Sequence, residues 1–234
     1  MPWAWDDTQK IHINTDDGSR MTREKLLAFS QQSVEASTSK VKTLASQVST
    51  GILTPEQWRE AMREELKREY IRQYLLGRGG RDQMTSVDWG SIGGSLVEQY
   101  KYLDGFADVV GGLTEGQIKV RTFVDLVALG SLGNGRFIGG VQRAAMYVNS
   151  SREAFYRART RALGFSPDEL PYHPADGGTP CLTRCNCDWE YVPVFDNDNN
   201  IIGWDCYWRL GASDVHCDGC LIRANESAPV EIRF

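Results

Sequence analysis

The sequence predicts a mainly α-helical body followed by a small cysteine-rich module built on a β-hairpin, an α+β fold overall. Two observations predict this division. All six cysteines lie at or after position 181, and apolar residues recur at helical spacing through most of the preceding chain. The 234 residues suffice for one large domain, or for a domain with a small appendage. We therefore divide the chain into an arm over residues 1–20, a helical body over 21–165 and the module over 166–234.

Residues 1–20 are polar and rich in aspartate, and they show no regular hydrophobic period. This composition predicts a flexible arm that becomes ordered against a partner. Trp3 and Trp5 are expected to be exposed anchors for that partner. The first residues are typical of neither a signal peptide nor a transit peptide. No apolar run approaches the roughly 20 residues of a membrane span, so we expect synthesis in the cytoplasm and no membrane partner.

The body is expected to contain five helices. The first has Thr22 as its N-cap and spans about 22–49. The second is the best specified, because Thr54, Pro55 and Gln57 combine an N-cap, a proline at the first helical position and a capping-box glutamine. Glycines at 77, 79 and 80 end that helix. The remaining three helices are expected over about 92–111, 114–129 and 143–163.

The module is expected to contain a β-hairpin and a short helix. Residues 189–195 and 201–208 alternate as strands do, and the polar stretch 196–200 between them predicts a turn. The short helix is expected over 221–226. The two cysteine clusters flank the hairpin on both sides.

The cysteine clusters carry the clearest chemistry in the sequence. One is Cys181-x-x-x-Cys185-x-Cys187, and the other is His216-Cys217-x-x-Cys220. Two thiolates at Cys-x-x-Cys spacing can both point at one tetrahedral ion, while the following helix presents its positive end to them. We predict a zinc ion held by Cys181, Cys185, Cys217 and Cys220, with Cys187 and His216 as alternate ligands. Disulfides and unlinked thiols are the alternatives, and the lack of a signal peptide weakens the disulfide interpretation. Four such ligands leave no open position, so the zinc would be structural.

Charge is unevenly distributed along the chain. Residues 119–165 carry eight Lys or Arg against two acids, whereas residues from 166 onward carry four against twelve. The candidate nucleic-acid-binding residues in the basic stretch are Arg143, Arg152, Arg157 and Arg161, with Arg159 nearby. Arg143, Arg157 and Arg161 share one face if the helix is continuous. The alternatives are a solvated helix face, or pairing with acids on a neighbouring protein or on the chain's own tail.

The sequence contains no recognisable catalytic constellation. It has three histidines, no His-Glu-x-x-His pair and no Gly-x-Ser-x-Gly elbow. No nucleophile, base and oxyanion site can be assembled from its motifs. We therefore predict a protein that is not an enzyme.

Several stretches from about residue 50 onward occur together in a characteristic order. They are Gly51-Ile-Leu-Thr-Pro-Glu-Gln-Trp58, Glu98-Gln-Tyr-Lys-Tyr-Leu-Asp-Gly-Phe106, Ala144-Ala-Met-Tyr147 and, above all, the two cysteine clusters with Pro229 shortly after. In these stretches the chain resembles the minor head, or head-morphogenesis, proteins of tailed bacteriophages, the group that includes the Mu-like minor head proteins.

This resemblance implies a virion component that acts at the portal or the inner capsid wall during head assembly. The implied partners are the portal, the major capsid protein and, non-specifically, packaged DNA. The protein is then expected in the host cytoplasm during assembly and in the virion afterwards, as an oligomer. The alternative function is a zinc-stabilised nucleic-acid-binding protein, although an acidic cysteine module has the wrong sign for phosphate.

Overall fold

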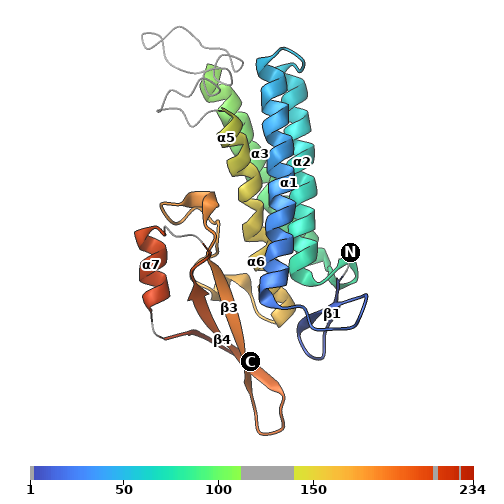
Figure 1. The fold of residues 1–234 in the computed structure, drawn as a ribbon, viewed down its shortest axis with the longest axis vertical. Helices are drawn as coiled ribbons and strands as arrows, with labels where there is room; N and C mark the ends of the chain where they lie inside the picture. The colour runs from blue at the N-terminus through green and yellow to red at the C-terminus, as the bar shows by residue number, and fades with distance from the viewer. Residues whose placement is uncertain (1–2, 112–139, 213–215, 227) are drawn as a thin grey trace.

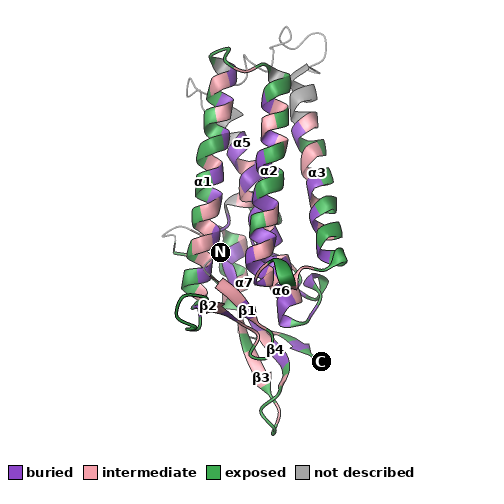
Figure 2. Cartoon of the chain, turned by 90° about the vertical axis from the view of Figure 1, so that its right-hand side faces the viewer, coloured by how far each residue is buried: buried purple, intermediate pink, exposed green. Residues whose placement is uncertain are grey.

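The computed structural model describes residues 3–111, 140–212, 216–226 and 228–234. A bundle of long helices forms one end of an elongated molecule, and the β-structures gather at the other end (Figures 1 and 2). The α-helices are α1 (Arg23–Ser49), α2 (Pro55–Arg78), α3 (Ser86–Gly111), α5 (Gly140–Asn149), α6 (Ser151–Leu163) and α7 (Asp218–Asn225). The 3-10 helices are η1 (Arg81–Gln83), η2 (Pro167–Glu169) and η3 (Leu182–Arg184). The predicted helix over 114–129 lies outside the described residues.

The first two helices begin where their capping residues predict. The Thr22 side chain accepts a hydrogen bond from the backbone of Lys25 at the start of α1. Thr54 and Gln57 form the reciprocal capping box of α2, and Gly79 ends that helix in the left-handed conformation, at φ 89°. Helix α3 begins at Ser86, six residues earlier than expected.

A ladder of buried polar contacts joins α1 to α2. The hydroxyl of Ser37 lies 2.8 Å from carboxylate oxygens of both Glu65 and Glu69, and the hydroxyl of Ser33 donates to Glu69. Glu69 has no accessible surface, and it further accepts from the amide of Gln73. Buried carboxylates are tolerated only when their oxygens accept hydrogen bonds. The serine-rich centre of α1 supplies these hydrogen bonds to the carboxylates of α2.

The continuous helix expected over 143–163 is instead two helices, α5 and α6, separated at Ser150. The hydroxyls of Ser150 and Ser151 both donate to backbone carbonyls three residues earlier, at 2.6 Å. Such back-bonding competes with the helical ladder and bends helices. Ser150 also hydrogen-bonds the hydroxyl of Tyr70 on α2, at 2.9 Å. The break is therefore tied to the packing of α5 and α6 against α2.

The predicted β-hairpin is confirmed as β3 (Asp188–Phe195) and β4 (Ile201–Arg209), which pair antiparallel. The carboxylate of Asp196 accepts from the backbones of Asp198 and Asn200 and so closes the turn. A third strand, β5 (Val230–Arg233), pairs with β4 and was not predicted. Helix α7 begins at Asp218, three residues before the expected start.

The N-terminal residues form a hairpin, which corrects the prediction of a flexible arm with exposed tryptophans. Strands β1 (Trp3–Asp6) and β2 (Ile11–Asn14) pair antiparallel, and Trp5 is buried. His12 is only 1% exposed. Its Nε2 donates to the carbonyl of Leu76 at 2.7 Å, and its Nδ1 accepts from Arg159 at 2.6 Å. These contacts with the ends of α2 and α6 hold the hairpin on the body.

The buried His12 makes stability dependent on pH. Burial first, and the Arg159 charge second, lower the pKa of His12 to about 3. An unfolded histidine titrates near pH 6.5, so the neutral ring stabilises the fold above that pH and loses its contribution as pH falls from 6.5 towards 3. We expect the free energy of unfolding to fall by about 2 kcal/mol more in the wild type than in His12→Gln when the pH is lowered from 7.5 to 5. Urea unfolding of both proteins at both pH values measures the difference, and parallel losses would contradict it.

The body and the module share a hydrophobic core. One cluster of buried residues contains Ala162, Leu163 and Phe165 together with Trp189 and Trp204 of the sheet. The indole of Trp204 also donates to the carbonyl of Leu163 at 3.0 Å. The division expected at 165/166 therefore runs through packed side chains. Within the described ranges, none of the helices is long and apolar enough to cross a membrane.

Candidate metal centre

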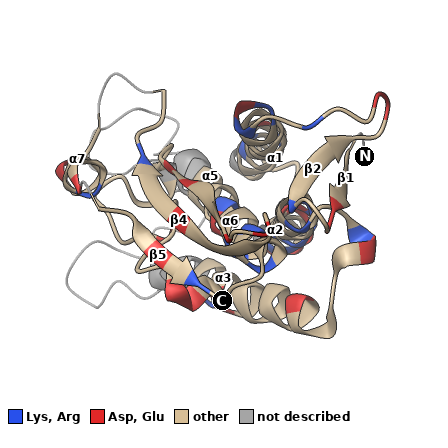
Figure 3. Ribbon diagram, turned by 90° about the horizontal axis from the view of Figure 1, so that it is seen from below, with Lys and Arg blue, Asp and Glu red and all other residues tan. Residues whose placement is uncertain are grey.

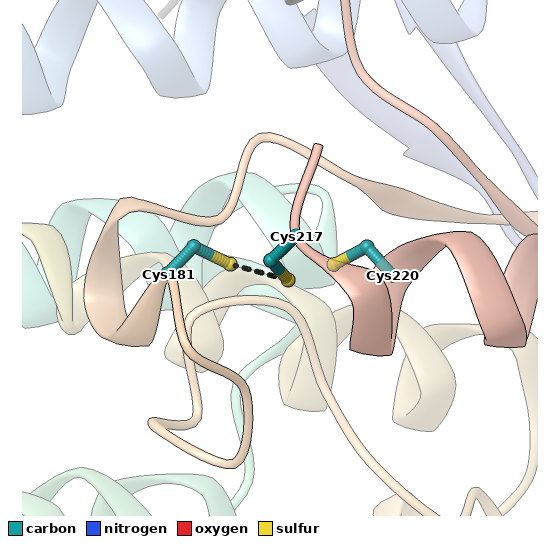
Figure 4. Close-up of side chains that lie close together, drawn as sticks. All are labelled: Cys181, Cys217 and Cys220. Carbon is teal, nitrogen blue, oxygen red and sulfur yellow. Dashed lines mark hydrogen bonds between the residues drawn. The ribbon is translucent and has the colours of Figure 1, made fainter. Parts of the chain in front are cut away.

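Two segments far apart in the sequence bring the cysteines together. The first is the loop that contains η3 and leads into β3, and the second is the start of α7. The Sγ atoms of Cys181 and Cys217 lie 3.6 Å apart, and those of Cys185 and Cys220 also lie 3.6 Å apart. Figure 4 shows the side chains of Cys181, Cys217 and Cys220 directed towards a common centre. Each contact therefore joins one cysteine of the loop to one cysteine of the helix.

These spacings suit a shared metal ion better than a disulfide. A sulfur–sulfur bond is about 2.05 Å long, and all six cysteines are free thiols. Tetrahedral zinc with Zn–S bonds of about 2.3 Å places its sulfurs about 3.8 Å apart, close to the two distances observed. Each pair of thiols therefore has the spacing of two ligands of one metal ion.

The four predicted ligands are divided between two groups of neighbouring thiols. Cys181, Cys217 and Cys220 form one group whose ligand atoms lie within 4.8 Å of one another, and Cys185, Cys187 and Cys220 form a second such group. Cys220 belongs to both. The alternate ligand Cys187 is therefore within reach, whereas the other alternate, His216, is in neither group. Cys206 lies apart on β4, opposite Tyr191 of β3, and is buried in the sheet core.

The protein environment affects the individual thiols differently. Burial opposes ionisation of Cys217, but hydrogen bonds from the Cys220 backbone and from the neighbouring thiols lower its pKa to about 7. Cys217 is also the N-cap residue of α7, where the helix dipole favours a thiolate. A hydrogen bond with Cys187 and burial raise the pKa of Cys185, and burial raises that of Cys220. Metal binding must displace these protons, so affinity should increase with pH.

Side chains of the helical body hold the loop that carries the cysteines. The buried guanidinium of Arg152 on α6 donates to the carbonyl of Cys185 and, at 2.8 Å, to Oδ1 of Asn186. Arg23 on α1 makes two hydrogen bonds, of 2.8 and 2.6 Å, with the buried carboxylate of Asp188. These contacts hold residues 185–188 against the bundle. Sequence reasoning missed them because they join residues more than 30 positions apart.

Comparison of the chain with protein-family models, with curated proteins and with solved structures found no match. The family resemblance therefore stays a prediction.

The expected cationic face for nucleic acid is not formed by the described arginines. Arg152 is buried and bonded to the module. Arg157 pairs with Glu153 at 2.6 Å and with Asp168 at 3.6 Å, and Arg161 lies 3.8 Å from the buried Asp88. The break at Ser150 also removes the continuous helix on which the shared face depended, and the side chain of Arg143 is outside the described set.

The alternative of pairing with an acid of the chain's own tail is confirmed for Arg157, which pairs with Asp168. Arg152 instead contacts the tail through the neutral oxygens of Cys185 and Asn186. Viewed from the end of the molecule where the β-structures gather, basic and acidic residues are intermixed (Figure 3). Among the described residues of the basic stretch, Arg152, Arg157 and Arg161 therefore serve internal contacts.

A glycine beside the loop provides a test of how closely the loop must pack. A Cβ atom on Gly211 would lie 2.2 Å from the backbone oxygen of Asn186. Asn186 follows Cys185 and precedes Cys187 in the chain, and both cysteines are candidate ligands. We expect Gly211→Ala to displace the loop and weaken metal binding by about tenfold or more, because overpacking costs about 1–3 kcal/mol. Gly219→Ala is the matched control, since its Cβ would meet nothing closer than 3.6 Å although it lies between Cys217 and Cys220. Competition with a chromogenic zinc chelator measures both affinities, and equal affinities would contradict the expectation.

Proposed function

We propose that this chain is a non-enzymatic structural component of a tailed-phage head, a minor capsid or head-morphogenesis protein stapled by one zinc ion. The observation that carries the zinc proposal is the convergence of four thiols in two pairs at 3.6 Å. Zinc is the ion we favour because thiolate ligands in a tetrahedral set suit it. We assign Cys181, Cys185, Cys217 and Cys220 as its ligands.

A zinc ion with four thiolate ligands has no open coordination position, so its role would be structural and not catalytic. It would fix the loop at 181–187 to α7, while Arg23 and Arg152 connect that loop to the bundle. A rigid, elongated body with a clamped module suits a protein that must present fixed surfaces to neighbours.

The phage-head assignment is supported by the order of motifs along the chain and by exposed apolar side chains on α3. Val87, Val97 and Tyr102 are each more than half exposed, and Trp89 is 40% exposed. Apolar side chains on one helix offer contact area to other proteins. The portal and the major capsid protein are the partners that this function implies.

Co-expression with the portal and major capsid proteins of a tailed phage tests the assignment. We expect the chain to sediment with assembled heads in a gradient, and to remain there after a high-salt wash. The Cys217→Ser variant should sediment less with heads, because its module is no longer stapled. A wild-type chain that stays at the top of the gradient while heads form would overturn the proposal.

The alternative is a zinc-stabilised nucleic-acid-binding protein. It receives less support, because the described arginines of the basic stretch are engaged within the chain and the module is acidic. Fluorescence anisotropy of the full chain with unrelated DNA duplexes at low salt discriminates between the two. Micromolar affinity, lost steeply as salt rises, would favour the alternative.

A further inference from the structure

A cavity of about 710 Å³ lies between the N-terminal hairpin, the start of α1, the end of α6 and the β3–β4 hairpin. This volume is in the range of sites for small molecules. Part of its wall is apolar, and this part includes Leu26, Phe155, Leu163, Ile201 and Trp204. None of the clustered thiols lines the cavity, so it is separate from the metal centre.

The charges that line the cavity are not balanced. The basic residues are Lys10, Arg20, Arg23 and Arg159, and the acidic residues are Asp188 and Glu190. Asp188 is bound by Arg23, and Glu190 is bound by Arg209 from outside the cavity. Lys10 pairs with Asp7. Among the residues that the structure describes, Arg20 and Arg159 therefore have no carboxylate partner.

Neutral groups hold Arg159 in place. Its guanidinium lies 5.7 Å from the ring centroid of Trp5, and its Nη1 donates to Nδ1 of His12 at 2.6 Å. The depressed pKa of His12 keeps that ring uncharged at neutral pH. Burial also lowers the pKa of Arg159 to about 10. A partly desolvated guanidinium without a counterion is costly, and an anion in the cavity would remove that cost.

A second polar group in the cavity wall has no partner. The hydroxyl of Tyr191 is buried and makes no hydrogen bond within the described structure. Tyr191 lines the cavity together with Arg159. Arg20, which is exposed, adds a further charge to the cavity lining.

We infer that this cavity binds a small amphipathic organic anion. Its carboxylate or phosphate group bonds to Arg159, whose planar donors match both groups, and is also attracted by Arg20. Its apolar part packs against Leu26, Phe155 and Trp204. This inference does not depend on the proposed role in a phage head.

Isothermal titration of the full chain with octanoate, octyl phosphate and 1-octanol tests the inference. The three probes share an eight-carbon chain and differ in their head group, so the first two identify the preferred anion. We expect at least one anion to bind with a stoichiometry of one, and octanol to bind about tenfold more weakly or worse, because a charge-assisted hydrogen bond is lost. Equal affinity for octanol, or no binding of either anion, would overturn the inference.

Three variants locate the site. Arg159→Gln and Arg20→Gln are each expected to weaken binding of the preferred anion, Arg159→Gln by about tenfold or more. Because Arg20 is exposed, its variant remains informative if Arg159→Gln fails to fold. Arg157→Gln is the matched control, since Arg157 lies on the same helix but outside the cavity lining. Wild-type affinity in Arg20→Gln, and in any Arg159→Gln protein that folds, would contradict the assignment.

Discussion

Cys217→Ser is expected to abolish binding of the proposed zinc ion and to unfold the module while most of the helical signal remains. Formation of a zinc site in a small module contributes on the order of 10 kcal/mol of coupled folding energy. The bundle should survive, because its main buried cluster, which includes Trp58, Met62 and Leu66, contains no residue of the module. Elemental analysis should find about one zinc per wild-type chain and almost none in the variant. Far-ultraviolet circular dichroism measures the helix that remains.

Cys206→Ala is the control for this experiment, because Cys206 is more deeply buried than Cys217 but lies outside the cluster. It should keep the full metal content. Loss of all helical signal in Cys217→Ser would instead mean that the core shared around Leu163 and Trp204 makes the chain one cooperative unit. Wild-type protein without metal, with its cysteines paired in mass spectrometry, would replace the zinc proposal with disulfides.

Arg152→Met is expected to destabilise the chain by about 3 kcal/mol, because it removes charged hydrogen bonds and leaves the buried carbonyl of Cys185 without that donor. The methionine keeps an apolar side chain in the space of the arginine stem. We also expect weaker zinc binding, since the loop with Cys185 would no longer be held against α6. Urea unfolding and chelator competition measure the two effects.

Arg81→Met, at an exposed position on η1, is the control and should change neither quantity appreciably. If Arg152→Met matched this control in stability, the contact between α6 and the loop would not be a structural connection. If it lost stability but bound zinc normally, the metal centre would assemble independently of the bundle.

Local patterns in the sequence predicted much of the fold. The capping box of Thr54 and Gln57 depends on four consecutive residues, and the alternation around the 196–200 turn depends on neighbouring pairs. The Cys217-x-x-Cys220 spacing likewise fixes two thiols at the start of one helix. Such features need no knowledge of distant segments, so helices α1 and α2, the β3–β4 hairpin and the grouping of the cysteines could all be predicted.

Contacts between distant segments were decided by the tertiary structure. The hydrophobic period is weak in residues 1–20, yet β1 and β2 form a hairpin there. The His12 ring holds this hairpin on the body through hydrogen bonds with the Leu76 carbonyl and the Arg159 guanidinium. Arg152 carries the same charge as a nucleic-acid-binding arginine, and only its burial against Cys185 reveals its structural role.

The sequence by itself therefore determined that five clustered thiols lie outside the helical bundle and that capped helices precede them. Only the tertiary structure decided which thiols approach within 3.6 Å, that Ser150 divides a helix, and that Arg159 faces a cavity without a carboxylate partner. The physical reason is that spacing along the chain fixes local hydrogen bonds, whereas burial and pairing depend on which surfaces meet when the chain folds.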